Sequence, residues 1–267
     1  MIPVGDTPRT RSLPWVNYAL IGVNILVFLY TLTLAADLAP TRLERFAQLR
    51  AQTEGVCYGF LAEPTEVNAF YCRWGFQPRE FFDAVAGTLP QGSDRLAILF
   101  TILTSLFIHG GWLHIVGNML FLWIFGDNVE DRLGHAGYLA FYVLAGAAAN
   151  VVQASIDPNS LVPVVGASGA IAGVLGAYLV MFPTAVIHVL VPVFIFFLVP
   201  IPIPAVVMIG IWFLQNLLAG FATLGDAATP DAGVAWFAHI GGFLFGFAFA
   251  ALFAREPRRA PPRSYPL

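Results

Sequence analysis

The chain has 267 residues, of which 58% are hydrophobic and 11% are charged, and its formal net charge at pH 7 is −3. Roughly a quarter of the residues of a soluble domain are charged, so this composition, with a mean hydropathy of +0.75, predicts a protein of the lipid bilayer. The negative net charge excludes the basic footprint that nucleic-acid binding requires.

The first long apolar stretch covers residues 15–36 and follows a polar N-terminus at 1–14. A helix needs about 20 apolar residues to cross the hydrocarbon core, and the apolar core of a signal peptide is shorter, about 7–15 residues. We therefore expect a retained transmembrane helix. Residues 37–95 are rich in arginines, acids and prolines and face water, and residues 96–109 are too short to span. Residues 37–111 are predicted as an extracytoplasmic loop that includes an interfacial or re-entrant segment.

Five further apolar stretches predict transmembrane helices, at residues 112–130, 136–156, 167–183, 204–224 and 233–253. The stretch at 184–204 is apolar enough to span, but four prolines break it. We expect it to form a loop at the membrane surface or against the bundle. Residues 112–254 then form a helical core, and residues 255–267 form a cytoplasmic tail.

Arginines set the predicted orientation. Arg9 and Arg11 precede the first span, and Arg255, Arg258 and Arg259 follow the last. Cation-rich ends mark the cytoplasmic side, so both termini are expected inside and the number of spans is even. The prediction is an all-α, multi-pass protein of the cell membrane with six transmembrane helices.

Four polar residues fall at one depth when the chain is threaded through this topology. His114 and Asn118 lie near the outer end of the second span, Ser168 begins the fourth, and His239 lies about six residues, or roughly 9 Å, into the sixth. Polar groups inside a membrane are costly and are functional candidates by default. The outer half of the bundle is therefore the predicted site.

The fourth span is short, about 16 residues or roughly 24 Å, against a hydrocarbon core of about 30 Å. It should begin inside the membrane, which places Ser168 at a sunken helix N-terminus. Backbone N–H groups there lack intrahelical partners and favour an anion. Such a site suits the oxyanion that forms when Ser168 attacks an amide carbonyl. A glycine-rich stretch such as 163–176 can also serve helix packing alone, and both interpretations are open on this evidence.

The other polar residues favour the nucleophile. His239 can act as the general base for Ser168, and His114 and Asn118, at i and i+4 on one helix face, can direct donors to the oxyanion. Small faces that include Gly169 and Gly242 allow the two helices to approach closely. Because no acid lies at this depth to orient His239, a Ser–His dyad is predicted rather than a triad. His109 is expected to be structural and to satisfy backbone groups.

At these residues the chain resembles the rhomboid family of intramembrane serine proteases. The resemblance covers roughly residues 95–255 and rests on three segments: "HGGWLHIVGNMLFLWIFGDNVEDRLG", "GASGAIAG" and "AHIGGFLFG". It implies a six-helix rhomboid bundle around a cavity open to the outside, with substrate entering beside the fifth helix. It assigns Ser168 as nucleophile, His239 as base, and His114, Asn118 and the Ser168 N–H as the oxyanion hole. Gly166 would shape the preceding loop, and Glu130 and Arg132 match a charged pair at the cytoplasmic end.

Two features depart from the family pattern. Members often show a Trp–Arg pair in the first outer loop, where this chain has only Arg95 before residues 96–107. The second departure lies beside the serine. Well-studied bacterial members carry an aromatic residue one turn after the serine, stacked on the histidine, where this chain has Ala172. We therefore expect another group, such as a neighbouring phenylalanine, to steady His239.

The resemblance implies a serine endopeptidase that cuts transmembrane segments of single-pass or multi-pass membrane proteins. No metal or cofactor and no nucleic-acid partner is expected, and the bilayer itself is a partner. The alternative is a non-catalytic relative that binds and escorts membrane clients. Such relatives usually lack the serine or the histidine, and this chain has both. The two cysteines, Cys57 and Cys72, both fall in the outer loop, where a disulfide and two free thiols are both open.

Overall fold

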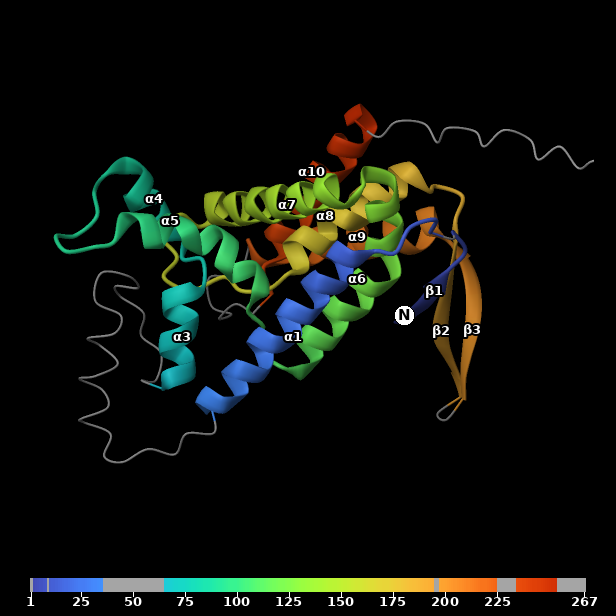
Figure 1. Ribbon diagram of the computed structural model, residues 1–267, viewed down its shortest axis with the longest axis horizontal. Coiled ribbons are helices and arrows are strands. Elements are labelled where there is room, and N and C mark those ends of the chain that lie inside the picture. Colours follow the sequence, from blue (N-terminus) through green and yellow to red (C-terminus); the bar gives the residue numbers. More distant parts are fainter. Residues whose placement is uncertain (1, 9, 36–64, 195–196, 225–233, 254–267) are drawn as a thin grey trace, which may run out of the picture.

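The computed structural model describes residues 2–8, 10–35, 65–194, 197–224 and 234–253 (Figure 1). Most of them lie in helices. These are α1 (Trp15–Ala35), α3 (Glu66–Trp74), α4 (Pro78–Ala86), α5 (Arg95–Thr104), a short 3₁₀ helix η1 (Ser105–Phe107), α6 (Trp112–Leu133), α7 (His135–Ile156), α8 (Ser168–Met181), α9 (Ala205–Thr223) and α10 (Trp236–Phe253).

Four of the described helices, α1, α7, α9 and α10, are long and apolar enough to cross a membrane. A fifth span is possible if α5–η1 and α6, which meet at an angle of 79°, are counted together as one broken span. α8 has 14 residues and is therefore only about 21 Å long. The chain is thus a helical membrane protein, and its helices begin and end within a few residues of the predicted stretches. The count of six spans stays a prediction.

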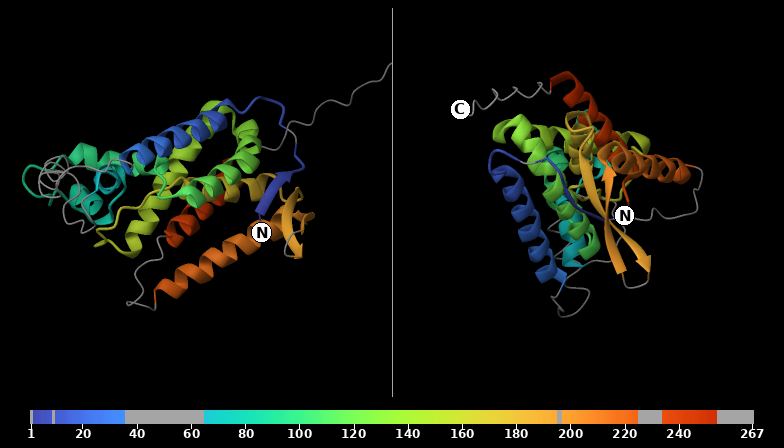
Figure 2. Two further views of the ribbon diagram at one scale, coloured as in Figure 1. Left: turned by 90° about the horizontal axis from the view of Figure 1, so that it is seen from below. Right: turned by 90° about the vertical axis from the view of Figure 1, so that its right-hand side faces the viewer.

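The region predicted as a loop at 184–204 is a β-hairpin, and that prediction was wrong. β2 (Val186–Phe194) and β3 (Phe197–Pro204) pair antiparallel, and β1 (Ile2–Asp6) pairs antiparallel with β2 on its other edge. Alternating β-branched residues favour a strand, and pairing supplies the backbone partners that a loop would lack. Figures 1 and 2 show this sheet at one end of the bundle, beside the N-terminus. The all-α prediction therefore misses one small sheet.

The prolines of the hairpin lie where a sheet tolerates them. Pro200, Pro202 and Pro204 occupy alternate positions of β3, which is an edge strand. Every second residue of a strand directs its backbone nitrogen to the same side, so all three can turn the side without an N–H away from β2. The prolines exclude a helix, as expected, but they are compatible with this strand.

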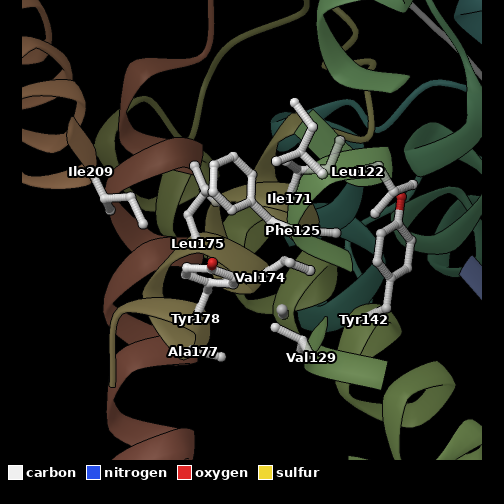
Figure 3. Close-up of a cluster of buried hydrophobic side chains, with 14 of the residues drawn as sticks. Leu122, Phe125, Val129, Tyr142, Ile171, Val174, Leu175, Ala177, Tyr178 and Ile209 are labelled. Carbon is white, nitrogen blue, oxygen red and sulfur yellow. The ribbon is translucent and has the colours of Figure 1, made fainter. Parts of the chain in front are cut away.

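α8 forms the centre of the bundle. All ten residues from 169 to 178 are buried, and α6, α7 and α10 pack around them. The side chains that fill the core come mainly from α6 and α8, with Tyr142 from α7 and Ile209 from α9 (Figure 3). A helix apolar on every side needs such complete burial, and this position explains how so short a helix stays in place.

Glycines let α8 and α10 approach more closely than side chains would permit. A Cβ atom on Gly242 would collide with the carbonyl oxygen of Gly169, and one on Gly246 would collide with that of Gly173. On the α7 side of α8, a Cβ on Gly169 would lie 2.5 Å from the Cβ of Ala149. The predicted small-residue contact is therefore present, and it brings the two backbones into contact.

The end of α6 holds the start of α1. The backbone N–H groups of Val16 and Asn17 donate to the carboxylate of Glu130 at 3.0 and 2.7 Å, which satisfies donors that the first turn of a helix leaves free. Arg132 lies over the ring of Phe182, 5.3 Å from its centroid. Glu130 thus caps a neighbouring helix, while Arg132 contacts an aromatic ring.

The outer loop is described only from residue 65 onward. Cys72 is buried in α3, whereas Cys57 lies outside the described residues.

We expect Gly246→Ala to destabilise the protein by about 1–3 kcal/mol, because the new methyl group has no space against α8. The matched control is Gly22→Ala on α1, where an added Cβ meets nothing within 4 Å. Thermal unfolding in detergent should show a lower melting temperature for Gly246→Ala only. Equal melting temperatures for the two variants would contradict the close contact.

A second prediction concerns Asp6, which accepts hydrogen bonds from Tyr178 at 2.5 Å and from Asn128 at 3.0 Å. Burial raises the pKa of Asp6 above the ordinary 3.8, despite these two hydrogen bonds. The folded state therefore favours the protonated acid, and its contribution to stability is lost as the pH rises through the raised pKa.

Asp6→Asn mimics the protonated acid and removes this dependence. The melting temperature of the variant minus that of the wild type should increase as the pH rises from about 4 through the raised pKa of Asp6. A difference that stays constant with pH would show that the ionisation of Asp6 does not act on the fold.

Candidate active site

Ser168 is the first residue of α8, and the loop before it has a backbone that requires glycine. Gly166 has φ +130°, a region that favours glycine, and its N–H donates to the Ser105 carbonyl at 2.9 Å. Ser105 is held in turn, since its hydroxyl accepts from Asn150 Nδ2 at 3.0 Å. The position of Ser168 is therefore fixed by η1 and α7 as well as by its own helix.

The outer loop also supports this segment. Phe76 and Val164 exchange two backbone hydrogen bonds, of 3.0 and 2.8 Å. The side chain of Gln77 donates to the Leu161 carbonyl at 2.6 Å, and a further backbone bond joins the Arg79 N–H to Ser160. The end of the long loop thus runs beside the segment that leads into Ser168 and braces it, a role that the sequence did not predict.

His239 faces Ser168 across the contact between α8 and α10. Its Nε2 lies 2.8 Å from the Ser168 Oγ, a normal hydrogen-bond distance. The glycine contacts one and two turns below bring the two helix backbones close enough for these short side chains to meet. The structure therefore brings together the two residues that the sequence singled out.

The other ring nitrogen of His239 also has a partner. Its Nδ1 lies 2.6 Å from Oδ1 of Asn216 on α9, and Nδ2 of Asn216 donates to the Trp212 carbonyl at 2.7 Å. The sequence prediction included no hydrogen-bond partner for the second nitrogen of His239, because no acid lies at that depth. A buried asparagine in an apolar helix was a usable signal, since buried polar groups need partners.

Two tryptophans flank the imidazole. The ring centroids of Trp212 and Trp236 lie 6.0 and 6.1 Å from that of His239, at interplanar angles of 35° and 87°. We expected a phenylalanine to take the place of the missing aromatic residue of α8, but the rings beside His239 are those of two tryptophans. Ala172 is fully buried, and the rings that confine His239 come from α9 and from the start of α10.

His114 lies beside the loop of Ser168. A Cβ placed on Gly166 would be 2.7 Å from the His114 Nε2 and 3.6 Å from the Ser168 Oγ. The imidazole nitrogen and the serine hydroxyl therefore border the same small space, and any side chain at position 166 would fill it.

Asn118 lies one turn further along α6 and is buried. Its Nδ2 lies 2.9 Å from Nε2 of His109, whose ring packs edge-on against that of His114, with centroids 4.9 Å apart. His109 was expected to be structural, and its ring contacts the side chain of Asn118. The ring of His109 thus contacts the two side chains, Asn118 and His114, that are predicted as oxyanion donors.

These residues line a cavity of about 950 Å³. Its walls come from α6, α7, α8, α9 and α10 and from the loop before α8, and Ser168, His239, His114, Asn118 and Trp212 all border it. Among the described residues, no three His, Cys, Asp or Glu side chains are grouped as metal ligands. The cavity combines a paired hydroxyl and imidazole with further hydrogen-bond donors in a mostly apolar wall.

The family model of the Rhomboid domain matches residues 97–256, which is more than half of the chain. The chain belongs to the rhomboid family. The match begins within α5 and extends just past α10, so it contains every residue of the cavity that the sequence singled out.

Curated rhomboids resemble this one at modest identity. RHOMBOID-like protein 5 of Arabidopsis thaliana is 28% identical over 59% of this chain and 45% of its own length. Rhomboid protein 1, mitochondrial, of Saccharomyces cerevisiae is 29% identical over 58% of this chain and 42% of its own. The putative rhomboid protease YdcA of Bacillus subtilis is 35% identical over 30% of this chain and 40% of its own. The chain thus matches less than half of the length of these relatives.

Proposed function

We propose that this rhomboid is a serine endopeptidase that cleaves membrane-protein substrates within the bilayer. The observation that carries the proposal is the 2.8 Å contact between Ser168 Oγ and His239 Nε2, made at the N-terminus of a buried helix. A hydroxyl becomes a competent nucleophile when an adjacent base can take its proton. The N-terminus of α8 offers donors for the negative charge that follows.

The reaction follows from these positions. Ser168 Oγ attacks the scissile carbonyl carbon while His239 Nε2 takes the hydroxyl proton. The negative charge on the carbonyl oxygen is stabilised by the Ser168 N–H together with His114 and Asn118. The imidazolium returns its proton to the leaving amine, the acyl-enzyme forms, and a water molecule activated by His239 then releases the acid.

We propose that the substrate enters the cavity as a locally unwound segment of a transmembrane helix. A regular helix keeps its carbonyls in internal hydrogen bonds, so the scissile peptide must be extended to reach Ser168. Gly166 leaves open the small space between His114 and Ser168, which favours a small residue before the scissile bond. The substrates are proposed to be single-pass or multi-pass proteins that enter from the bilayer beside α9, the fifth predicted helix.

The position of the N-terminal strand and the arginines near both chain termini support the proposed membrane topology. β1 pairs with the hairpin that joins α8 to α9, so the N-terminal strand lies at the end opposite Ser168. The arginines near both termini favour the cytoplasm for that end. We infer a multi-pass protein of the cell membrane with six crossings and a core at 112–254, whose site opens to the extracytoplasmic side.

A non-catalytic rhomboid that escorts membrane clients is the second candidate. The comparisons include proteins named only as rhomboid-like, and membership of the family is compatible with either role. Both Ser168 and His239 are present and in hydrogen-bond contact, which favours the enzyme.

Ser168→Ala and His239→Ala should each abolish cleavage of a model transmembrane substrate in proteoliposomes, and labelling by a fluorophosphonate probe should disappear with it. Ser155→Ala is the control, because that exposed hydroxyl on α7 bonds only its own helix at Val151. Full cleavage by Ser168→Ala would refute the protease, and a wild type that neither cleaves nor labels would favour the escort.

His114→Ala and Asn118→Ala test the oxyanion hole. Each should lower kcat by about 10²–10³-fold, because a donor that acts on the developing charge is lost. KM should change little, since these donors serve the transition state more than the ground state. An unchanged kcat in both variants would exclude them from that role.

A further inference from the structure

Asn216 gives His239 a third partner in a site predicted to have only two members. Its side chain is buried within α9 and contacts the histidine on the face away from Ser168. We propose that Asn216 is a positioning residue that holds the proton of His239 on Nδ1, so that Nε2 is free to accept the proton of Ser168. This inference rests on the proposed protease function and adds a residue to it.

The orientation of the amide decides which ring nitrogen carries the proton. Asn216 Nδ2 donates to the carbonyl of Trp212, one turn earlier on α9. The oxygen of the amide therefore faces His239, 2.6 Å from Nδ1. An amide oxygen can only accept, so Nδ1 must be the nitrogen that bears hydrogen. In neutral imidazole the other nitrogen then carries a lone pair, and here it faces the Ser168 Oγ.

The opposite tautomer would be unfavourable in this setting. It would place the lone pair of Nδ1 against the lone pairs of the Asn216 oxygen, and it would direct the Nε2 hydrogen at Ser168. A base must have an acceptor at the nitrogen that faces the nucleophile. A neutral asparagine is sufficient for this, because the task is to fix the tautomer and the ring plane.

The other residues around His239 show why its contact with Asn216 matters for the orientation of the ring. On α8, the residue after Ser168 is Gly169 and the residue one turn on is Ala172, so neither position supplies an aromatic ring. On the other side, α9 supplies both the amide of Asn216 and the ring of Trp212. The histidine is therefore held from α9, which lies at the edge of the bundle beside α10 (Figure 2).

Loss of this acceptor should act on the chemical step. Without it, both tautomers are populated and the ring can turn, so a smaller share of molecules holds a base against Ser168. General-base catalysis contributes about 10²–10⁴-fold, and we expect Asn216→Leu to lower kcat by about 100-fold. KM should stay within about twofold, because Asn216 is not among the described residues that line the cavity.

The experiment compares three variants of the full chain in proteoliposomes with a model transmembrane substrate. Asn216→Leu keeps the size of the side chain and removes the acceptor. Asn216→Asp keeps an acceptor for the Nδ1 proton and should restore kcat to within about tenfold of the wild type. Gln215→Leu removes the neighbouring amide, which is exposed on α9, and should behave as the wild type. The rate of fluorophosphonate labelling and the melting temperature are measured alongside.

The predicted pattern is a low kcat for Asn216→Leu, recovery in Asn216→Asp and an unchanged KM. A wild-type kcat in Asn216→Leu would overturn the inference. So would equal losses in Asn216→Leu and Asn216→Asp that follow a fall in melting temperature, because that result assigns Asn216 to packing. Ser168→Ala separates the two proposals: if it still cleaves, the protease fails, and if it is inactive while Asn216→Leu is not, only the role of Asn216 fails.

Discussion

The contact between the backbones of α8 and α10 determines the geometry of the rest of the site. Serine and histidine side chains are short, so helices at the usual separation of about 8–10 Å place them too far apart unless the backbones come closer. Gly242 and Gly246 have no side chain where α8 passes. The close approach of α8 and α10 allows the 2.8 Å contact between Ser168 and His239. The glycines are therefore as necessary to this contact as the two polar residues.

Supports from four directions then restrict the polar groups. The loop before Ser168 is tied to η1 through Gly166 and Ser105 and is braced by the end of the outer loop at Phe76. His239 is held from α9, and Asn118 from His109. A buried polar group that loses its partner is costly, so each of these bonds restricts the side chain that makes it. Neighbouring elements thus hold the polar groups that border the cavity in place.

Much of this arrangement could be predicted from the sequence, because its signals are local. The lengths of the apolar stretches predicted the helices. The topology inferred from the arginines predicted one depth for four residues that line one cavity in the structure: Ser168, His239, His114 and Asn118. The hairpin at 186–204 was missed, since its prolines exclude a helix without revealing that an edge strand accommodates them. Asn216 was missed because no spacing connects it to His239. Its role depends on how α9 packs, which a single sequence does not specify.

The sheet has a consequence for how the protein is made. β1 pairs with residues that the ribosome adds much later, as in the pairing of Asp6 with Ile187. Such a distant pairing forms late, because closure of a long loop must precede it. During synthesis the first strand therefore stays unpaired until the helices from α1 to α8, which lie between β1 and β2 in the chain, have been made. The pairing of β1 with β2 can form only after the connection between α8 and α9 has been made, and until then β1 has an open strand edge.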